Sequence, residues 1–352
     1  MSSQAGFGCA RRRARVLAAI EELDYRPNLV ARSLAQGRSY VLALLLTDIA
    51  NPFYAELSRD VENIAQEHGY RLLVCDTAYN VGAGREYLHD LAGRRVDGLL
   101  AMGGSLDSQG IRANGLQGPR IVLCNWEEDA DFLRLARRGA MPPAVGLDFA
   151  YGGALAAHHL VEQGHRRIGV IVHGAGPGRI NHISRLTGFR TALAAESVTL
   201  DDADVYYGDS TIESGYTAMT ALLRTQRRPS GVFATNDLMA IGALNAAYDL
   251  GQRVPDDLAV VGFDNISMAA HVRPALTTVG VAPRALATEA MELLLRQVDG
   301  ADRQGQRPYH LSLRPSLIVR RSSGGQSAPI RDPDGDGHKD DDGARPPVSG
   351  GA

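Results

Sequence analysis

The chain has 352 residues, 44% of them hydrophobic and 22% charged, and a formal net charge of −3, which is the composition of a soluble globular protein with room for two lobes. This balance excludes a protein that holds nucleic acid by its overall charge and leaves only a local basic patch for that purpose. The sequence has neither the ~18-residue apolar run of a membrane span nor a secretory signal at its start, and its three cysteines lie far apart. We therefore expect a cytoplasmic protein without membrane contact.

The basic patch lies in the first 40 residues, which hold seven arginines against three acidic residues. Within it, residues 25–34 are mostly small and apolar, with Pro27 and Asn28 near their start and Gly37 after them, as expected of a short capped helix. Residues 1–10 are rich in glycine and serine and show no helical periodicity. A basic helix directly before a buried strand suggests contact with nucleic acid.

From residue 41 onward, apolar runs alternate with amphipathic helical patterns. Strands that are apolar throughout are typical of a parallel sheet with helices on both faces, and the alternation spans too many residues for one sheet of usual size. We predict two α/β lobes, with strands over 41–46, 71–75, 96–101, 120–124, 167–172, 231–234 and 258–263. Helices are predicted over 53–68, 85–91, 151–163, 185–195, 213–223, 238–250 and 284–298, and short strands around 309–313 and 316–319.

Three predicted helices are followed by a glycine, namely Gly69, Gly164 and Gly251. Each glycine stands where a left-handed C-terminal cap would turn the chain toward the next strand. After residue 321 the chain is rich in glycine, proline, serine and aspartate. We therefore predict a disordered tail over 322–352.

Seven motifs occur in an order and spacing that resemble the LacI/GalR family of transcriptional regulators, from about Arg13 to Arg321. They lie at 15–28 (RVLAAIEELDYRPN), 48–56 (DIANPFYAE), 95–98 (RVDG), 164–169 (GHRRIG), 235–240 (TNDLMA), 262–264 (GFD) and 274–279 (PALTTV). Each motif alone is weak, whereas seven in order are specific.

The resemblance implies an α/β chain with a two-lobed periplasmic-binding-protein-like fold, parallel sheets and three crossovers, preceded by a helical headpiece remnant and a hinge helix. Residues 1–39 would be the truncated DNA-binding headpiece and hinge, and 322–352 the tail. The N-terminal lobe would comprise 40–149 with 281–311, and the C-terminal lobe 150–280 with 312–321. The resemblance also implies a homodimer, operator DNA, and an effector bound in the cleft between the lobes.

The N-terminal region departs from the family pattern. Family members carry about two more helices, including the recognition helix, before the segment that matches residues 15–23, so we expect an incomplete helix-turn-helix. By resemblance, Asn28 would cap the hinge helix, Leu34 with Ala31 beside it would insert between base steps, and Arg32 and Arg38 would meet phosphates. The alternative is a linker helix that packs on the body.

The effector site is expected beyond the carboxyl ends of the strands, where ligands of open α/β sheets bind. By resemblance, Arg185 and Asp264 would hold ligand hydroxyls, and aromatic side chains would form an apolar wall. Planar polar groups together with aromatic rings suit a sugar. The full expected set is Phe53, Tyr54, Asn125, Trp126, Arg179, Asn181, Arg185, Asn236 and Asp264.

Some residues at and beside this site could have a purely structural role. Phe53 could belong to the core, Tyr54 could point to the lobe interface, and Asp237 is expected to cap the helix that follows it. Asn125 stands where many relatives have an aspartate. Ser210 occupies a position that is often aromatic, which argues against a purine ligand.

The sequence shows no nucleophile–base arrangement and no metal-ligand cluster, so we expect neither an enzyme nor a cofactor. It predicts an effector-responsive, DNA-binding transcriptional regulator of the repressor type that senses a small molecule, a carbohydrate. Two alternatives stay open. One is a cytoplasmic sugar-binding protein, and the other is a DNA-blind dimerisation partner that lacks its own recognition helix.

Overall fold

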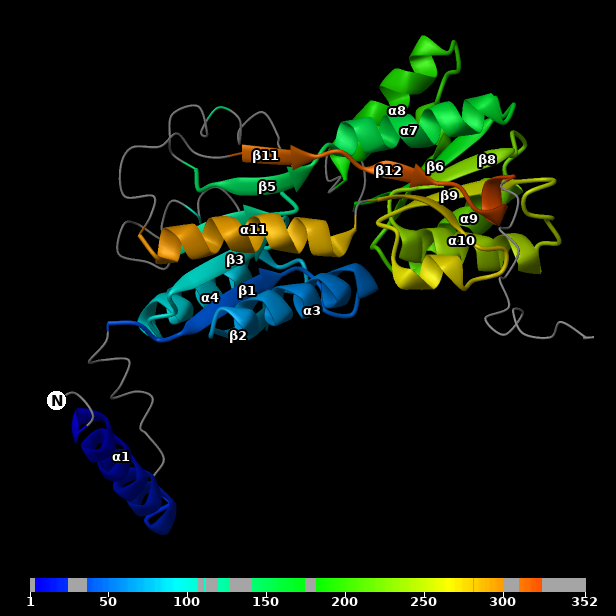
Figure 1. The fold of residues 1–352 in the computed structure, drawn as a ribbon. Helices are drawn as coiled ribbons and strands as arrows, with labels where there is room; N and C mark the ends of the chain where they lie inside the picture. Colours follow the sequence, from blue (N-terminus) through cyan, green and yellow to red (C-terminus); the bar gives the residue numbers. More distant parts are fainter. Residues whose placement is uncertain are drawn as a thin grey trace, which may run out of the picture.

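The computed structural model describes residues 4–24, 37–106, 111, 120–126, 134, 141–174, 182–280, 282–300 and 310–324 (Figure 1). The first element is helix α1, Gln4–Glu22. Our expectation of a non-helical start was therefore wrong for residues 4–10. A glycine inside a helix costs only about 1 kcal/mol relative to alanine, so Gly6 and Gly8 do not stop a helix that alanines and arginines favour.

The first sheet has six parallel strands in the order β11-β5-β4-β3-β1-β2. Its strands are β1 Val41–Leu46, β2 Arg71–Asp76, β3 Gly98–Met102, β4 Arg120–Cys124, β5 Ala144–Leu147 and β11 His310–Leu313. Its helices are α3 Pro52–Glu67, α4 Val81–Gly93 and α11 Pro283–Val298. Helix α11 packs along α3 and against the middle of this sheet (Figure 1).

The second sheet has the order β12-β10-β9-β8-β6-β7, with β12 antiparallel to β10 and the other pairs parallel. Its strands are β6 Ile168–His173, β7 Val205–Gly208, β8 Gly231–Ala234, β9 Ala259–Phe263, β10 Thr277–Gly280 and β12 Ser316–Ile318. The helices of this half are α7 Phe149–Glu162, α8 Ile183–Ala195, α9 Ile212–Arg224 and α10 Asp237–Asp249, with 3-10 turns η1 Asp202–Asp204, η2 Ser267–Ala270 and η3 Arg321–Ser323.

The chain crosses between the two sheets three times, as the two-lobed fold requires. The crossings lie between β5 and α7, between β10 and α11, and between β11 and β12, which follow one another directly in Figure 1. Two bounds differ from the expected division. Helix α7 of the second half begins at Phe149, and β11 of the first sheet extends to Leu313, two residues past 311.

The start of the predicted tail also differs from our expectation. Ser322 and Ser323, which we placed in the tail, belong to η3 and are buried. Ser322 Oγ donates to the carbonyl of Val260 at 2.6 Å and accepts from Thr277 N at 2.8 Å, so hydrogen bonds to the second sheet hold this polar segment. Residues 325–352 lie outside the described residues.

The predicted helices and strands are present in the described residues, but β5, β7 and β10 were not predicted. Each of these three strands has only four residues, which leaves little pattern to detect, although β8, which is equally short, was predicted. The three glycine caps are confirmed, because Gly69, Gly164 and Gly251 have φ of 78°, 89° and 68°. Among the helices that the structure describes, none is long and apolar enough to cross a membrane.

Candidate effector site

An ion pair between Arg185 and Asp264 forms the centre of the candidate site. Arg185 lies in the first turn of α8, and Asp264 directly follows β9. Their Nη1 and Oδ1 atoms are 3.3 Å apart, and the two residues are only 4% and 8% exposed. A buried ion pair has to repay the desolvation of both charges, so it persists only with further partners.

Those partners are present around the guanidinium. Arg185 Nη1 donates to the carbonyl oxygen of Thr235, and its Cζ lies 4.0 Å from the ring centre of Phe263 and 4.8 Å from that of Phe149. A planar guanidinium suits this position against the faces of two adjacent rings better than a lysine ammonium does. Burial raises the pKa of Asp264 to about 6, and Arg185 opposes that rise. The carboxylate is therefore ionised at neutral pH.

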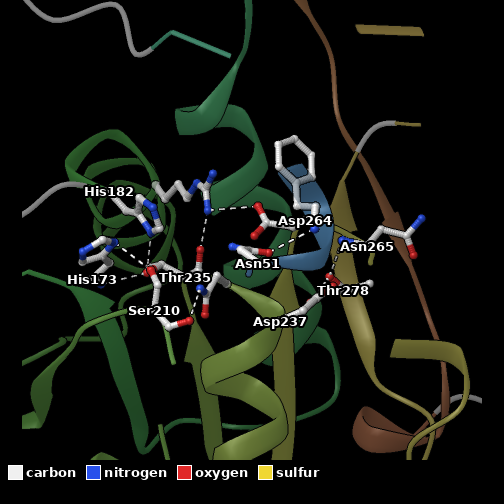
Figure 2. A network of polar contacts seen from close by, with 12 residues as sticks. Asn51, His173, His182, Ser210, Thr235, Asp237, Asp264, Asn265 and Thr278 are labelled. Carbon is white, nitrogen blue, oxygen red and sulfur yellow. Dashed lines mark hydrogen bonds and ion pairs between the residues drawn. The ribbon is translucent and has the colours of Figure 1, made fainter. Parts of the chain in front are cut away.

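Two histidines extend the polar cluster around Arg185, of which His173 is buried and His182 is partly buried (Figure 2). Nδ1 of His173, at the end of β6, is 2.7 Å from Ser210 Oγ, and Nδ1 of His182 is 3.0 Å from Thr235 Oγ1. Thr235 Oγ1 also accepts from the backbone N–H of His173 at 3.1 Å. Burial, and then the charge of Arg185, lower the pKa of His173 to about 4 and that of His182 well below its usual value. Both rings are neutral at pH 7.

Side chains from the first lobe reach this cluster. The ring of Tyr79 lies edge-on to that of His173, with centroids 4.8 Å apart. Glu56 Oε1, on α3, accepts a hydrogen bond from the backbone N–H of Ser267 at 3.0 Å. Figure 2 shows Asn51, the residue that caps α3, beside Asp264. The site therefore takes residues from both lobes.

The predicted aromatic residues are buried in the first lobe. Phe53 and Tyr54 are 3% and 8% exposed, and both belong to the hydrophobic core. Tyr54 also lies near the ion pair, since the charges of Asp264 and Arg185 both act on its pKa. Phe53 thus lies in the core, which was the alternative that the sequence left open for it.

Asn125 and Trp126 follow β4, as predicted. Asn125 has a left-handed backbone with φ of 52° and is 8% exposed. Its Oδ1 atom is buried and has no hydrogen-bond partner among the described residues. Leaving such an acceptor unpaired costs about 1–3 kcal/mol, which a ligand hydroxyl would recover. Trp126 is partly buried against the core of the first sheet.

The structure assigns the helix cap at the start of α10 differently from our prediction. Asn236, named as a supporting ligand contact, is the N-cap of α10: its Oδ1 accepts from Met239 N at 2.8 Å, and its Nδ2 donates to the Ser210 carbonyl at 3.2 Å. Asp237, expected as the cap, lies inside α10 and binds Thr278 and the backbone of Ile266. The first polar residue of the Asn-Asp pair is the cap, because the helix begins one residue earlier than predicted. Arg179 and Asn181 lie outside the described residues.

Arg38 also has a different position from the one expected. Its Nη1 lies 3.0 Å from Asp299 Oδ1, and its Nη2 donates to the carbonyl oxygen of Val298 at 3.0 Å. The guanidinium thus binds the carboxyl end of α11, where unpaired carbonyls favour a cation, instead of lying free for phosphate. The other expected DNA contacts lie outside the described residues; they are Asn28, Ala31, Arg32 and Leu34.

Three residues of the cluster were not predicted from the sequence, namely His173, His182 and Tyr79. Each follows or ends a strand, or begins a helix, but none stands in a motif, and single histidines are common in cores. Only the folded chain shows that the two histidine rings lie 5.0 Å apart and next to Arg185. The described part of the chain holds no group of three histidine, cysteine or acidic residues that could bind a metal ion, and Cys75 and Cys124 are free thiols.

Comparisons with known proteins agree with this architecture. Residues 157–323 match the periplasmic binding protein-like domain family. The chain is 36% identical over 320 residues to the HTH-type transcriptional repressor PurR of Proteus mirabilis, covering 90% of this chain and 89% of that protein. Its structure resembles the transcriptional regulator CelR–cellobiose complex, with a TM-score of 0.69, 31% identity, and coverage of 88% and 90% of the two chains.

A second solved structure, the transcription regulator GntR from Chromobacterium violaceum, gives a TM-score of 0.70 at 28% identity and covers 81% of this chain and all of that one (100%). These relatives are regulators and not enzymes. The match to the PurR repressor extends over almost the whole length of this chain. The chain belongs to the LacI/GalR family of effector-responsive transcriptional regulators.

Proposed function

We propose that this protein is a repressor whose effector is a neutral carbohydrate bound between the two lobes at Arg185 and Asp264. The observation that carries the proposal is the charge balance of the site. One guanidinium and one carboxylate pair at 3.3 Å, and the histidines beside them are neutral at pH 7. A neutral ligand with several hydroxyls can bond to both partners without separating their charges.

Asn125 supports a hydroxyl-bearing ligand from the first lobe, since its buried Oδ1 lacks a donor among the described residues. Trp126 and Tyr54 supply aromatic surface near the same strand ends, which suits the apolar face of a sugar ring. Arg179 and Asn181 follow the second-lobe strand β6 in sequence, and we include them in the proposed site. One structural relative, at 31% identity, is a cellobiose complex.

We further propose that the protein acts as a homodimer on operator DNA through residues 25–36. Asn28 would cap the hinge helix, Ala31 and Leu34 would contact base steps, and Arg32 would meet phosphate. Binding of this kind depends steeply on salt, because phosphate contacts release counterions. A regulator of this type works where the chromosome is, in the cytoplasm.

A thermal-shift screen tests the effector class. Ligands that bind only the folded chain raise its melting temperature by mass action. We expect a rise with one of the neutral saccharides cellobiose, glucose or ribose, and none with glucose 6-phosphate or with the purines hypoxanthine and guanine. Asp264→Asn should give a much smaller rise at the same ligand concentration, whereas the exposed-helix variant Asp90→Asn should retain it. A rise with a purine or a sugar phosphate alone would overturn the proposal.

A further inference from the structure

Asp237 carries a fully buried carboxyl group that the site described above does not use. It is 0% exposed and lies in the first turn of α10. Its Oδ1 accepts a short hydrogen bond of 2.5 Å from Thr278 Oγ1, and its Oδ2 accepts from the backbone N–H of Ile266 at 2.9 Å. Burial raises the pKa of Asp237 well above its usual value, and each of its two buried oxygens has a hydrogen-bond partner.

The two residues that precede Ile266 form a turn with an unfavourable backbone. Asp264 has φ of 107° and Asn265 has φ of 53°, a region that residues with a Cβ adopt at a cost of about 1–3 kcal/mol. Such a conformation persists only when its surroundings hold it. The direction in which Asp264 presents its carboxylate to Arg185 depends on this turn.

Hydrogen bonds fix the turn at both ends. On one side Asp264 N donates to the carbonyl of Val279 at 2.7 Å. On the other, Asn265 N lies 3.3 Å from Thr278 Oγ1, and Ile266 N donates to Asp237. Thr278 therefore links the turn to Asp237, which Figure 2 shows directly beneath Asp264 and Asn265.

Gly262 in β9 leaves the space that the carboxyl group of Asp237 occupies. A Cβ added to Gly262, two residues before Asp264, would stand 2.2 Å from Asp237 Oδ1. This is far inside van der Waals contact, so a glycine is required at 262 for Asp237 to reach the turn. The close contact of Asp237 with the turn therefore depends on β9, on α10 and on the turn itself.

We propose that Asp237 is a positioning residue that holds the Asp264–Asn265 turn and thereby sets the carboxylate of Asp264 against Arg185. Its bearing on effector affinity rests on the proposed function, whereas its hold on the turn does not. Asp237 acts through Ile266 N and Thr278 Oγ1 and needs no contact with the ligand.

Amide hydrogen exchange of residues 262–268 tests the hold on the turn without any ligand. In Asp237→Ala we expect the Ile266 amide to exchange at least tenfold faster, because its acceptor is lost. Asp237→Asn keeps one acceptor oxygen for Ile266 and should recover part of the protection. Thr278→Val, which preserves the volume but removes the hydroxyl, should speed exchange at Asn265.

A matched control separates this local effect from general unfolding. Asp257 likewise accepts from a backbone N–H, that of Arg253 at 2.9 Å, but on an exposed turn. Asp257→Ala should leave residues 262–268 unchanged. Equal acceleration over the whole second lobe in Asp237→Ala, or no acceleration at Ile266, would overturn the positioning role.

A second readout is effector binding by Thr278→Val, followed with cellobiose through the fluorescence of Trp126, the single tryptophan of the chain. We expect at least tenfold weaker binding by a chain that stays folded, and unchanged affinity would contradict the link from the turn to the site. If cellobiose does not bind wild type, the titration is repeated with glucose and ribose. A wild-type chain that binds none of the three would count against the proposed function, and the exchange experiment would still decide the role of Asp237.

Discussion

The rings of Tyr79 and His173 pack in a T-shaped arrangement with centroids 4.8 Å apart and planes at 85°, and this contact joins the first lobe to the second. Edge-on aromatic pairs contribute about 0.5–1.5 kcal/mol beyond the area that they bury. A double-mutant cycle with Tyr79→Ala and His173→Ala should therefore give a coupling of about 1 kcal/mol in urea unfolding. Additive effects of the two substitutions would show that the rings do not stabilise each other.

The buried histidines make the stability of the protein depend on pH. The pKa of His173 is lowered to about 4. Between pH 6.5 and 4 the unfolded chain therefore binds a proton at this residue that the folded chain does not bind. The stabilisation is thus present above pH 6.5 and lost as the pH falls toward 4, by up to about 3 kcal/mol. The charged and titratable groups that act on or touch His173 are Arg185, Asp209, His182 and Tyr79.

His173→Gln should flatten this decline in urea unfolding measured at pH 7 and at pH 5, because glutamine does not titrate. Asp264 acts in the opposite direction. Its folded pKa of about 6 exceeds that of the unfolded chain, so the folded state takes up its proton first and gains stability as the pH falls from 6. Asp264 is present in both the variant and wild type, so the difference between them reports on His173. If the free energy of unfolding has the same pH dependence in both, His173 is not held neutral by burial.

Arg185→Lys should weaken effector binding at least tenfold and lower the free energy of unfolding by about 2–4 kcal/mol, although it preserves the charge. The guanidinium lies over the adjacent rings of Phe149 and Phe263, and it donates to Thr235 while it pairs with Asp264. A lysine cannot reproduce that planar geometry, and it leaves a buried carboxylate poorly paired. Thermal melting together with saccharide titration would measure both effects.

Gly153→Ala should impair the same site from a distance. A Cβ at Gly153, on α7, would stand 2.0 Å from the carbonyl oxygen of Arg185, so α8 would have to move. Overpacking of this kind costs about 1–3 kcal/mol, and here it also displaces the residue that pairs with Asp264. Gly93→Ala at the end of α4 is the control, since nothing lies within 4 Å of the added carbon. Equal melting temperatures of the two variants would contradict this packing argument.

The sequence predicted the strand–helix alternation and the two lobes because buried parallel strands are apolar along their whole length, as in β1 and β3. It did not predict β5, β7 and β10, whose four residues carry little pattern. Their place at or next to one edge of a sheet depends on neighbours far away in the chain.

The candidate site was predicted in part for a similar reason. Arg185 and Asp264 could be named from motifs, and they form an ion pair. The contacts of His173 with Tyr79 and Ser210 join residues that are 94 and 37 positions apart by number, so no local signal marks them. The cap of α10 was assigned to Asp237 instead of Asn236, because a shift of one residue in the helix start decides which side chain is the cap.

The most direct test of the effector site is a titration of the protein with cellobiose, glucose and ribose, followed by the fluorescence of Trp126 at pH 7.5 and pH 5. One saccharide should bind wild type and Asp90→Asn alike, at least tenfold more weakly to Asp264→Asn, and more weakly to wild type at pH 5, where Asp264 becomes protonated below its pKa of about 6. Flat titrations with all three saccharides, or equal binding by Asp264→Asn and wild type, would contradict a neutral-sugar site built on Arg185 and Asp264.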